Sequence, residues 1–288
     1  MAITYSGLYL QTRKTLKDAG NAAPDLAARE LVCFASHKNR ETLIRDGGLY
    51  AAPEIAESVE ELTRRHLDGE PVAYIIGEWE FYGLTLAITP QVLIPRPDTE
   101  TLAEQAIDYL KTQGPCRVLD LCAGSGCVGI ALAAHVPEAK IVLGDLSDAA
   151  LKLCSRNIWS NSFSGRVVPV RADALEEPDP RIGRFAAIVC NPPYIPSGDI
   201  PSLDHSVRDY EPHMALDGGA DGLTFYRAIA EKWREALHPN GRIFFEVGIN
   251  QSLPVTQILR QNGFGEVQHF NDRNGVPRVV TGVRYPDI

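Results

Sequence analysis

The chain has 288 residues, of which 44% are hydrophobic and 23% are charged, the proportions of an ordinary globular protein. These proportions exclude a disordered, collagenous or coiled-coil chain, and no apolar run approaches the ~18 residues that a membrane helix needs. The 28 lysines and arginines against 37 acidic residues give a net charge of −9, which weighs against a protein that binds nucleic-acid backbones.

Residues 1–71 are predicted to form a small helical bundle. Pro24 and Pro53 are placed to begin helices, Asn39 to cap a short helix, and the segment 68–71 to end the last one. No catalytic constellation stands out among these residues. The functional alternative to a purely structural domain is that the bundle grips a partner.

Residues 72–95 are predicted to form a β-hairpin that links two domains. Residues 80–88 alternate like a strand, and a second apolar run, 92–94, follows Thr89-Pro90. The segment 95–98 breaks the pattern, and Asp98 or Thr99 is expected to cap a helix that follows.

Residues 96–288 are predicted to be an α/β domain. Short apolar strands alternate with amphipathic helices, which indicates a doubly wound, mainly parallel, seven-stranded sheet covered on both faces. The stretch 195–220 fits no element, and a loop of that length is usually functional or disordered. The predicted strands are 117–121, 140–144, 166–171, 185–190, 241–247, 265–270 and 278–283, and the predicted helices include 147–160 and 222–237.

A glycine-rich turn follows the first of these strands. Gly124, Gly126 and Gly129 give the pattern G-x-G-x-x-G, in which the first two glycines let backbone N–H groups approach a ligand and the third packs helix on strand. Asp145 follows about 20 residues later, where a carboxylate can accept hydrogen bonds from two ribose hydroxyls. An adenosine-containing ligand is therefore expected, with a plain tight turn as the alternative.

Two further acids favour S-adenosylmethionine over a dinucleotide. Asp120 precedes the glycines, where it is awkward beside a pyrophosphate but suits the ammonium of a methionine moiety. Asp173 follows the third strand, where it can meet an adenine amino group or simply cap a helix.

The most specific segment is Asn191-Pro192-Pro193-Tyr194, directly after an apolar strand. In a doubly wound sheet, this strand end lies in the crevice where ligands bind. Two prolines remove two backbone donors, which leaves the Asn191 side-chain oxygen and the Pro192 carbonyl as acceptors for both hydrogens of a planar NH₂ group. Such acceptors align an amide or amine nitrogen for in-line transfer, with Tyr194 as a flat packing face. The alternative is a rigid proline turn.

These motifs, together with segments 77–83, 93–100 and 210–216, resemble the protein-(glutamine-N5) methyltransferases of the HemK/PrmC type. Those enzymes act on class I peptide chain release factors. The similarity covers nearly the whole chain, and Ile94-Pro-Arg-Pro-Asp-Thr-Glu100 is its most discriminating segment. It implies a Rossmann-like methyltransferase domain that uses S-adenosylmethionine, yields S-adenosylhomocysteine, and methylates the glutamine of the Gly-Gly-Gln motif to modulate translation termination.

The resemblance also implies roles for individual residues. Asn191, Pro192 and Tyr194 are expected to be catalytic. The expected cofactor contacts are Asp120, Cys122, Ala123, Gly124, Gly126, Asp145, Leu146, Asp173, Ala174 and Asn191. The expected substrate contacts are Asn191, Pro192, Pro193, Tyr194, Arg96, Glu211 and Glu246. This sequence departs from the family in having Cys122-Ala123 where residues such as Gly-Thr are common. Residues 1–71 are expected to recognise the release factor.

The cysteines and the N-terminus bear on location and assembly. The six cysteines lack C-x-x-C spacing, so we predict neither a disulfide framework nor a metal site. Residues 1–14 lack the features of a signal peptide. We therefore expect a cytoplasmic monomer that binds neither DNA nor a membrane. The cysteines are Cys33, Cys116, Cys122, Cys127, Cys154 and Cys190.

Four other interpretations stay open. Within the same chemistry, the substrate could be ribosomal protein L3 or a flipped DNA base. A DNA enzyme would want a basic recognition domain, whereas residues 1–85 carry 9 basic and 13 acidic side chains. An NAD(P)-dependent oxidoreductase leaves residues 191–194 unexplained. A module that binds the cofactor only to recruit a partner predicts tight binding without turnover.

Overall fold

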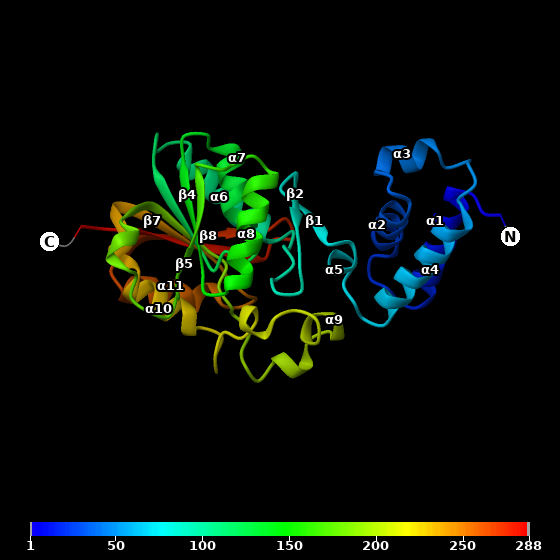
Figure 1. Cartoon of the computed structure of the whole chain (residues 1–288). Helices are drawn as coiled ribbons and strands as arrows, with labels where there is room; N and C mark the ends of the chain where they lie inside the picture. Colours follow the sequence, from blue (N-terminus) through cyan, green and yellow to red (C-terminus); the bar gives the residue numbers. More distant parts are fainter. Residues whose placement is uncertain (1, 287–288) are drawn as a thin grey trace. The chain divides into compact units, whose positions relative to one another are not determined.

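The computed structural model describes residues 2–286, which form two compact units (Figure 1). The first unit contains the chain up to Glu78 together with the segment His205–Tyr210. The second contains Trp79–Asp204 and the chain from Glu211 onward. Within residues 2–286, no helix is both long enough and apolar enough to cross a membrane.

The first unit is helical, as predicted. Asn39 Oδ1 accepts a hydrogen bond of 2.8 Å from Thr42 N, and Pro24 and Pro53 are the first residues of their helices. The unit's apolar core contains Tyr5, Leu8, Val32, Leu43, Ala51 and Val59. Its helices are α1 (Tyr5–Asp18), α2 (Pro24–Ser36), α3 (Arg40–Arg45), α4 (Pro53–Leu67), α5 (Val72–Ile76) and the short α9 (His205–Arg208).

Helix α5 falls in a stretch that was expected to belong to the hairpin. Pro71 stands at its N-cap with φ −60°, and the Pro71 carbonyl accepts from the amides of Tyr74 and Ile75. Gly77, with φ 76°, ends the helix in the left-handed conformation. A fixed proline φ at one end and a glycine at the other therefore favour one helical turn over an extended strand.

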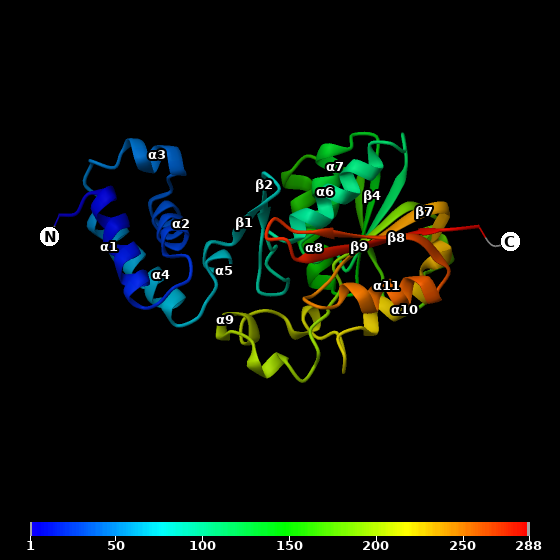
Figure 2. The same ribbon diagram turned by 180° about the vertical axis from the view of Figure 1, so that it is seen from behind.

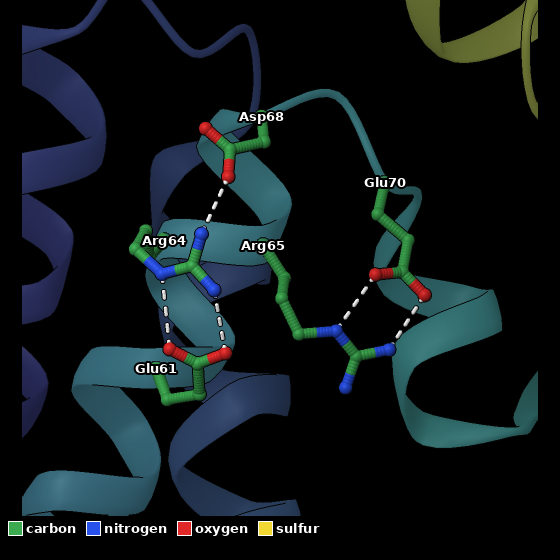
Figure 3. Close-up of polar contacts among 5 residues, drawn as sticks. All are labelled: Glu61, Arg64, Arg65, Asp68 and Glu70. Carbon is green, nitrogen blue, oxygen red and sulfur yellow. Dashed lines mark hydrogen bonds and ion pairs between the residues drawn. The ribbon is translucent and has the colours of Figure 1, made fainter.

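Ion pairs between charged side chains stabilise the C-terminal end of α4 (Figure 3). Arg64 contacts Glu61 at 2.7 Å and Asp68 at 2.8 Å, whereas Arg65 reaches past the end of the helix to Glu70 at 2.6 Å. Exposed pairs of this kind contribute little to stability. Their main effect is to fix the direction in which the chain leaves α4.

The hairpin is shorter than the predicted 72–95, and its first strand begins at Glu78 instead of residue 80. Strands β1 (Glu78–Phe81) and β2 (Leu84–Ala87) pair with each other, so the prediction of one continuous strand over 80–88 and a second at 92–94 is wrong. The turn residues Tyr82 and Gly83 have φ of 51° and 76°. Two successive residues with positive φ make the tight turn that matches the twist of paired strands, and they break residues 80–88 in the middle.

The second unit is built on a seven-stranded sheet, as predicted, in the order β5-β4-β3-β6-β7-β9-β8. Neighbouring strands from β5 to β7 are parallel, and β9 runs antiparallel to both β7 and β8. The antiparallel part of the mainly parallel sheet is therefore formed by β9 with its neighbours β7 and β8. The strands are β3 (Arg117–Leu121), β4 (Lys140–Asp145), β5 (Val167–Arg171), β6 (Phe185–Cys190), β7 (Leu237–Glu246), β8 (Phe264–Asn271) and β9 (Pro277–Arg284).

Helices cover the sheet on both faces: α6 and α7 lie on one face, and α10 and α11 lie on the other (Figures 1 and 2). The predicted helix 222–237 is interrupted, because α10 ends at Lys232 and a single 3₁₀ turn leads into β7. On that face, Tyr226 and Trp233 are buried against the sheet with Phe245. The helices are α6 (Thr99–Leu110), α7 (Cys127–His135), α8 (Asp148–Ser160), α10 (Thr224–Lys232) and α11 (Ser252–Gln261).

The strand registers bring the predicted motifs to one edge of the sheet. Leu121, the last residue of β3, pairs with Gly144 on one side and with Cys190 on the other. The carboxyl ends of parallel strands lie at the same edge of a sheet. The glycine loop, Asp145 and Asn191 therefore emerge next to one another.

The segment 195–220 follows a defined path built from one-turn helices. Besides α9, it contains 3₁₀ turns at Ile200–Ser202 and His213–Ala215. Ile195 N donates to the Leu216 carbonyl at 3.0 Å, and Gly218 N donates to the Ile195 carbonyl at 2.8 Å. These two bonds hold the far end of the segment against the chain that leaves the Asn-Pro-Pro-Tyr motif.

Candidate functional site

A cavity of about 430 Å³ lies at the carboxyl edge of the parallel strands. It is bordered by the loops after β3, β4, β5 and β6. Every predicted cofactor residue except Gly126 lines it, as do three of the predicted substrate residues, Asn191, Arg96 and Pro193. The cofactor residues on its wall are Asp120, Cys122, Ala123, Gly124, Asp145, Leu146, Asp173, Ala174 and Asn191.

The three glycines of the loop do different things. Gly124 has φ 57°, and a side chain built there would meet nothing within 4 Å, so the backbone at this position is open to a ligand. Gly126 donates its N–H to the Ala123 carbonyl at 2.8 Å, and an added Cβ would lie 2.9 Å from Leu143 Cδ1. At Gly129 an added Cβ would lie only 2.2 Å from Leu143 Cδ2. The second and third glycines therefore allow α7 to pack tightly on β4.

Asp120 is a buried carboxylate on the cavity wall. It is 2% exposed, and its Oδ2 accepts from Gly129 N at 2.8 Å. Burial raises the pKa of Asp120 to about 7, and the nearby Asp145 carboxylate adds to the rise. A buried anion that lacks a cationic partner is costly, so a bound ammonium or sulfonium would be stabilised here. The cavity thus fits the charge of the methionine end of S-adenosylmethionine.

Asp145 holds two loops together at the end of β4. Its Oδ2 accepts from Gly124 N and its Oδ1 from Ser147 N, each at 2.8 Å. Burial raises the pKa of this carboxyl group, whereas the backbone N–H donors oppose that rise. Each carboxylate oxygen can accept a second hydrogen bond, so both stay available to a ribose diol.

Asp173 borders the same cavity from the loop after β5. Its Oδ1 accepts from Leu175 N at 2.9 Å, so it stabilises its own turn. No helix begins at this point, so the expected helix cap is wrong, whereas the contact with an adenine amino group stays a prediction.

Asn191 is oriented by a residue that the sequence indicated only as a helix cap. Its Nδ2 donates to Thr99 Oγ1 at 3.4 Å, and Thr99 also lowers the pKa of the buried Glu246. The Thr99 hydroxyl therefore accepts from the amide NH₂ of Asn191. The Asn191 carbonyl oxygen is then left for the cavity.

Neither predicted cap residue caps α6 through its side chain. The helix begins at Thr99, but the Asp98 carboxylate pairs instead with Arg278 at 2.9 Å. Asp98 therefore stands in a charged cluster with Arg278 and Asp272. The Asp98 carboxylate could either cap α6 or pair with an arginine, and in the folded chain it pairs with Arg278.

Glu246 lies behind Asn191 and does not line the cavity. It is 1% exposed, and burial raises its pKa to about 7. Its Oε2 has no hydrogen-bond partner among the described residues. Tyr194 is also outside the cavity wall, and burial together with the charge of Glu246 raises the pKa of Tyr194 to about 12.

Arg96 and Glu211 form an ion pair of 2.6 Å between segments 115 residues apart. Glu211 is buried, which raises its pKa, and Arg96 opposes that rise. Arg96 reaches the cavity, whereas Glu211 and Pro192 do not line it. Glu211 thus acts on the cavity by holding the Arg96 guanidinium.

Gln251 is a structural support that the sequence did not indicate. Its Nε2 donates to the Tyr194 carbonyl at 2.9 Å, and its Oε1 accepts from Gly248 N at 3.0 Å. These bonds fix the backbone just after the two prolines. Nothing in a single sequence marks a glutamine after β7 as a partner of residue 194.

Comparisons with known proteins identify the family of the chain. The family model "PrmC N-terminal domain" matches residues 8–77, and "Methyltransferase small domain" matches residues 100–202. A release factor glutamine methyltransferase from Geobacter sulfurreducens is 41% identical over 80% of this chain and 79% of its own. The enzyme of that name from Clostridium botulinum is 34% identical over 96% of this chain and 98% of its own.

Two solved structures are also similar. A release-factor-specific protein-(glutamine-N5) methyltransferase from Alicyclobacillus acidocaldarius is 31% identical, over 67% of this chain and 95% of its own, with a TM-score of 0.41. A methyltransferase from Pyrococcus furiosus aligns over 79% of this chain and 100% of its own with a TM-score of 0.50 at 17% identity, which speaks for the fold alone.

The sheet topology and the acid-lined cavity define a methyltransferase of the Rossmann-like class that uses S-adenosylmethionine. The 34% identity to a relative over 96% of this chain identifies the family within that class. The chain belongs to the release factor glutamine methyltransferase family.

Proposed function

We propose that this protein transfers a methyl group from S-adenosylmethionine to the side-chain amide nitrogen (N5) of the glutamine in the Gly-Gly-Gln motif of class I peptide chain release factors. This reaction would modulate translation termination. The observation that carries the proposal is the Asn191 carbonyl oxygen, which Thr99 leaves free at the wall of a cavity lined by Asp120 and Asp145.

The chain's own residues orient the two reactants. S-adenosylmethionine, when bound, supplies an electrophilic methyl group on a sulfonium. The Asp120 carboxylate binds the methionine end of the cofactor, and the Asp145 carboxylate binds the ribose. The adenine packs against the wall formed by Asp173 and Ala174. The loop around Gly124 leaves room for the ligand to approach the backbone.

The substrate amide is held by acceptors. We assign the Asn191 oxygen and the Pro192 carbonyl to the two N–H groups of the glutamine amide, with Pro193 and Tyr194 packing beside it. Holding both hydrogens directs the nitrogen lone pair toward the methyl group, and this alignment replaces a general base. Arg96, held by Glu211, and Glu246, acting through Thr99, support the same site.

The direct test uses tritiated S-adenosylmethionine, a purified release factor and, as matched control, the same factor with glutamine replaced by alanine in the Gly-Gly-Gln motif. Label on the motif glutamine of the first factor alone is the expected result. Label elsewhere in the factor, on ribosomal protein L3 alone, or on DNA would overturn the proposal.

Variants of Asn191 separate binding from chemistry. Asn191→Ala should keep the cofactor dissociation constant and lower the single-turnover rate by about 10²–10³. Asn191→Asp keeps the shape but adds a negative charge beside the sulfonium, which stabilises the ground state more than the transition state and slows transfer. Wild-type rates in both variants would remove Asn191 from the reaction.

We further propose that residues 1–71 recognise the release factor. Three large apolar side chains lie exposed within seven residues of this unit: Ile44 at 72%, Leu49 at 59% and Tyr50 at 70%. Apolar groups gathered on a surface are typical of protein contacts. Ile44→Ser combined with Tyr50→Ser should raise KM for the release factor and leave the cofactor dissociation constant unchanged. An unchanged KM would contradict this assignment.

We also propose that the protein is a monomer located in the cytoplasm. A monomer in the cytoplasm that does not act on DNA agrees with the net charge of −9 and with free cysteines throughout the described chain. Sedimentation of the purified protein tests the first part. A dimer at micromolar concentration would contradict it.

A further inference from the structure

Two cysteines meet at the edge of the sheet that carries the cavity. Cys190 ends β6 and pairs in register with Leu121 of β3, and Cys122 is the next residue along. Parallel strands lie about 4.8 Å apart and rise about 3.3 Å per residue, which places the Cα atoms of Cys122 and Cys190 roughly 6 Å apart. Disulfides form across Cα separations of about 4.4–6.8 Å.

The side chains of this pair also face each other. Cys122 packs against the buried cluster that contains Cys190, and Cys122 contributes to the raised pKa of Cys190. Cys190 is fully buried, whereas Cys122 lines the cavity. A small solute that enters the cavity therefore reaches Cys122 and not Cys190.

The neighbouring Cys154 is directed elsewhere. It is buried, and its Sγ donates to the Gly124 carbonyl at 3.3 Å. Burial also raises the pKa of Cys190, so Cys190 itself reacts poorly with an oxidant. Cys127 lines the cavity as well, but burial raises its pKa to about 12. Within the pair, Cys122 is therefore the first sulfur to react and Cys190 the second.

We propose that Cys122 and Cys190 are a peroxide-sensitive pair whose disulfide reversibly closes the methyl-transfer site. Hydrogen peroxide oxidises the Cys122 thiol to a sulfenic acid and releases one water. The Cys190 sulfur then attacks the Cys122 sulfur, the S–O bond breaks, and the Cys190 proton leaves with the hydroxyl group as a second water. In total, two thiols and one peroxide give one disulfide and two waters, and a dithiol reverses the reaction by exchange.

The cross-link would distort both halves of the site. Cys122 opens the loop that contains Gly124, and Cys190 directly precedes Asn191. Bringing two packed but unbonded sulfurs to the bonding distance of about 2.05 Å requires one or both segments to move. Misplacement of about 1 Å at a reacting centre costs about 10²-fold in rate.

The consequence for activity rests on the proposed function, but the cross-link does not. The full-length protein is treated with a small molar excess of hydrogen peroxide, digested without reductant, and mapped by mass spectrometry. The expected result is a peptide linking Cys122 to Cys190 that disappears with dithiothreitol. Prior incubation with S-adenosylhomocysteine should slow its formation at least 5-fold, because the ligand covers Cys122. Absence of the linked peptide, or no protection by the ligand, would overturn the proposal whatever the substrate proves to be.

Matched variants assign the effect to this pair. Cys190→Ala should give no cross-link and should accumulate a Cys122 sulfenic acid that dimedone traps, whereas Cys116→Ser should cross-link like the wild type. Each oxidised sample is compared with its own reduced sample. The oxidised wild type should bind the cofactor at least 10-fold more weakly and regain full affinity with dithiothreitol. Full cofactor affinity in the cross-linked protein would refute closure of the site.

Discussion

Replacing Thr99 by valine tests whether the contacts behind Asn191 position it for transfer. Valine keeps the size and branching of threonine but removes the hydroxyl that joins Asn191 to Glu246. Thr99 is 2% exposed and Glu246 is 1% exposed, so water cannot easily replace the lost group. Thr99→Ser retains the hydroxyl and serves as the matched control.

The magnitude follows from the two partners of the Thr99 hydroxyl. The Thr99 hydroxyl favours the charged form of the buried Glu246, and loss of a polar group beside a buried carboxyl costs about 1–3 kcal/mol of unfolding free energy. The bond from Asn191 Nδ2 is 3.4 Å long and is worth less, but it decides which end of the amide faces the cavity. If the valine variant presents the NH₂ end in a large share of molecules, the transfer rate falls about 10-fold, equivalent to about 1.4 kcal/mol.

Three measurements separate these effects. Single-turnover methyl transfer at saturating cofactor should fall about 10-fold in Thr99→Val and stay within 2-fold in Thr99→Ser. Calorimetry should give an unchanged cofactor dissociation constant in both, and urea unfolding should show the stability loss in valine alone. Equal transfer rates in the valine and serine variants would show that Thr99 does not orient Asn191.

Three other changes have defined outcomes. Asp145→Ala, which also loses the 2.8 Å contacts to two loops, should weaken S-adenosylmethionine binding about 10–100-fold by calorimetry, and unchanged affinity in the folded variant would exclude Asp145 from the site. In Gly218→Ala the new Cβ would lie 2.7 Å from Tyr194 Cα, so we expect a loss of about 1–3 kcal/mol in urea unfolding together with slower transfer, whereas Gly198→Ala in the same segment meets nothing within 4 Å and should do neither. Burial raises the pKa of Glu246 from 4.5 to about 7, so the folded state binds the proton more tightly, and the unfolding free energy without cofactor should fall by about 3 kcal/mol as the pH rises from 4.5 to 7. In Glu246→Gln the unfolding free energy should fall by about 3 kcal/mol less over this pH range. A pH profile identical to that of the wild type would contradict the interpretation of Glu246 as a buried carboxyl group.

Features that depend on neighbouring residues could be predicted from the sequence. The Asn39 side chain accepts a hydrogen bond from the amide three residues later. Pro24 and Pro53 each occupy the first position of a helix, where a proline needs no hydrogen-bond acceptor for a missing N–H. The alternation of apolar strands with amphipathic helices indicated a doubly wound parallel sheet because only buried strands tolerate such runs. Since parallel strands end at one edge, the same pattern also indicated that Asp120, Asp145 and Asn191 would meet.

Local signals failed in two short segments where a turn or cap competed with the apolar pattern. Residues 80–88 alternate like one strand, yet Tyr82 and Gly83 adopt positive φ and turn the chain back. Residues 72–76 have the apolar character of a strand but form a helical turn between Pro71 and Gly77. In each case a tight turn or cap outweighs the periodicity of a short segment.

The partners of the site residues were decided only by the tertiary structure. Thr99 lies 92 residues from Asn191, and Arg96 lies 115 residues from Glu211. A carboxylate near a helix start can cap it or pair with an arginine from another strand, and Asp98 takes the arginine. Burial likewise depends on everything packed around a group, which is why the raised pKa of Asp120 and the facing thiols of Cys122 and Cys190 follow from the folded sheet and not from the order of residues.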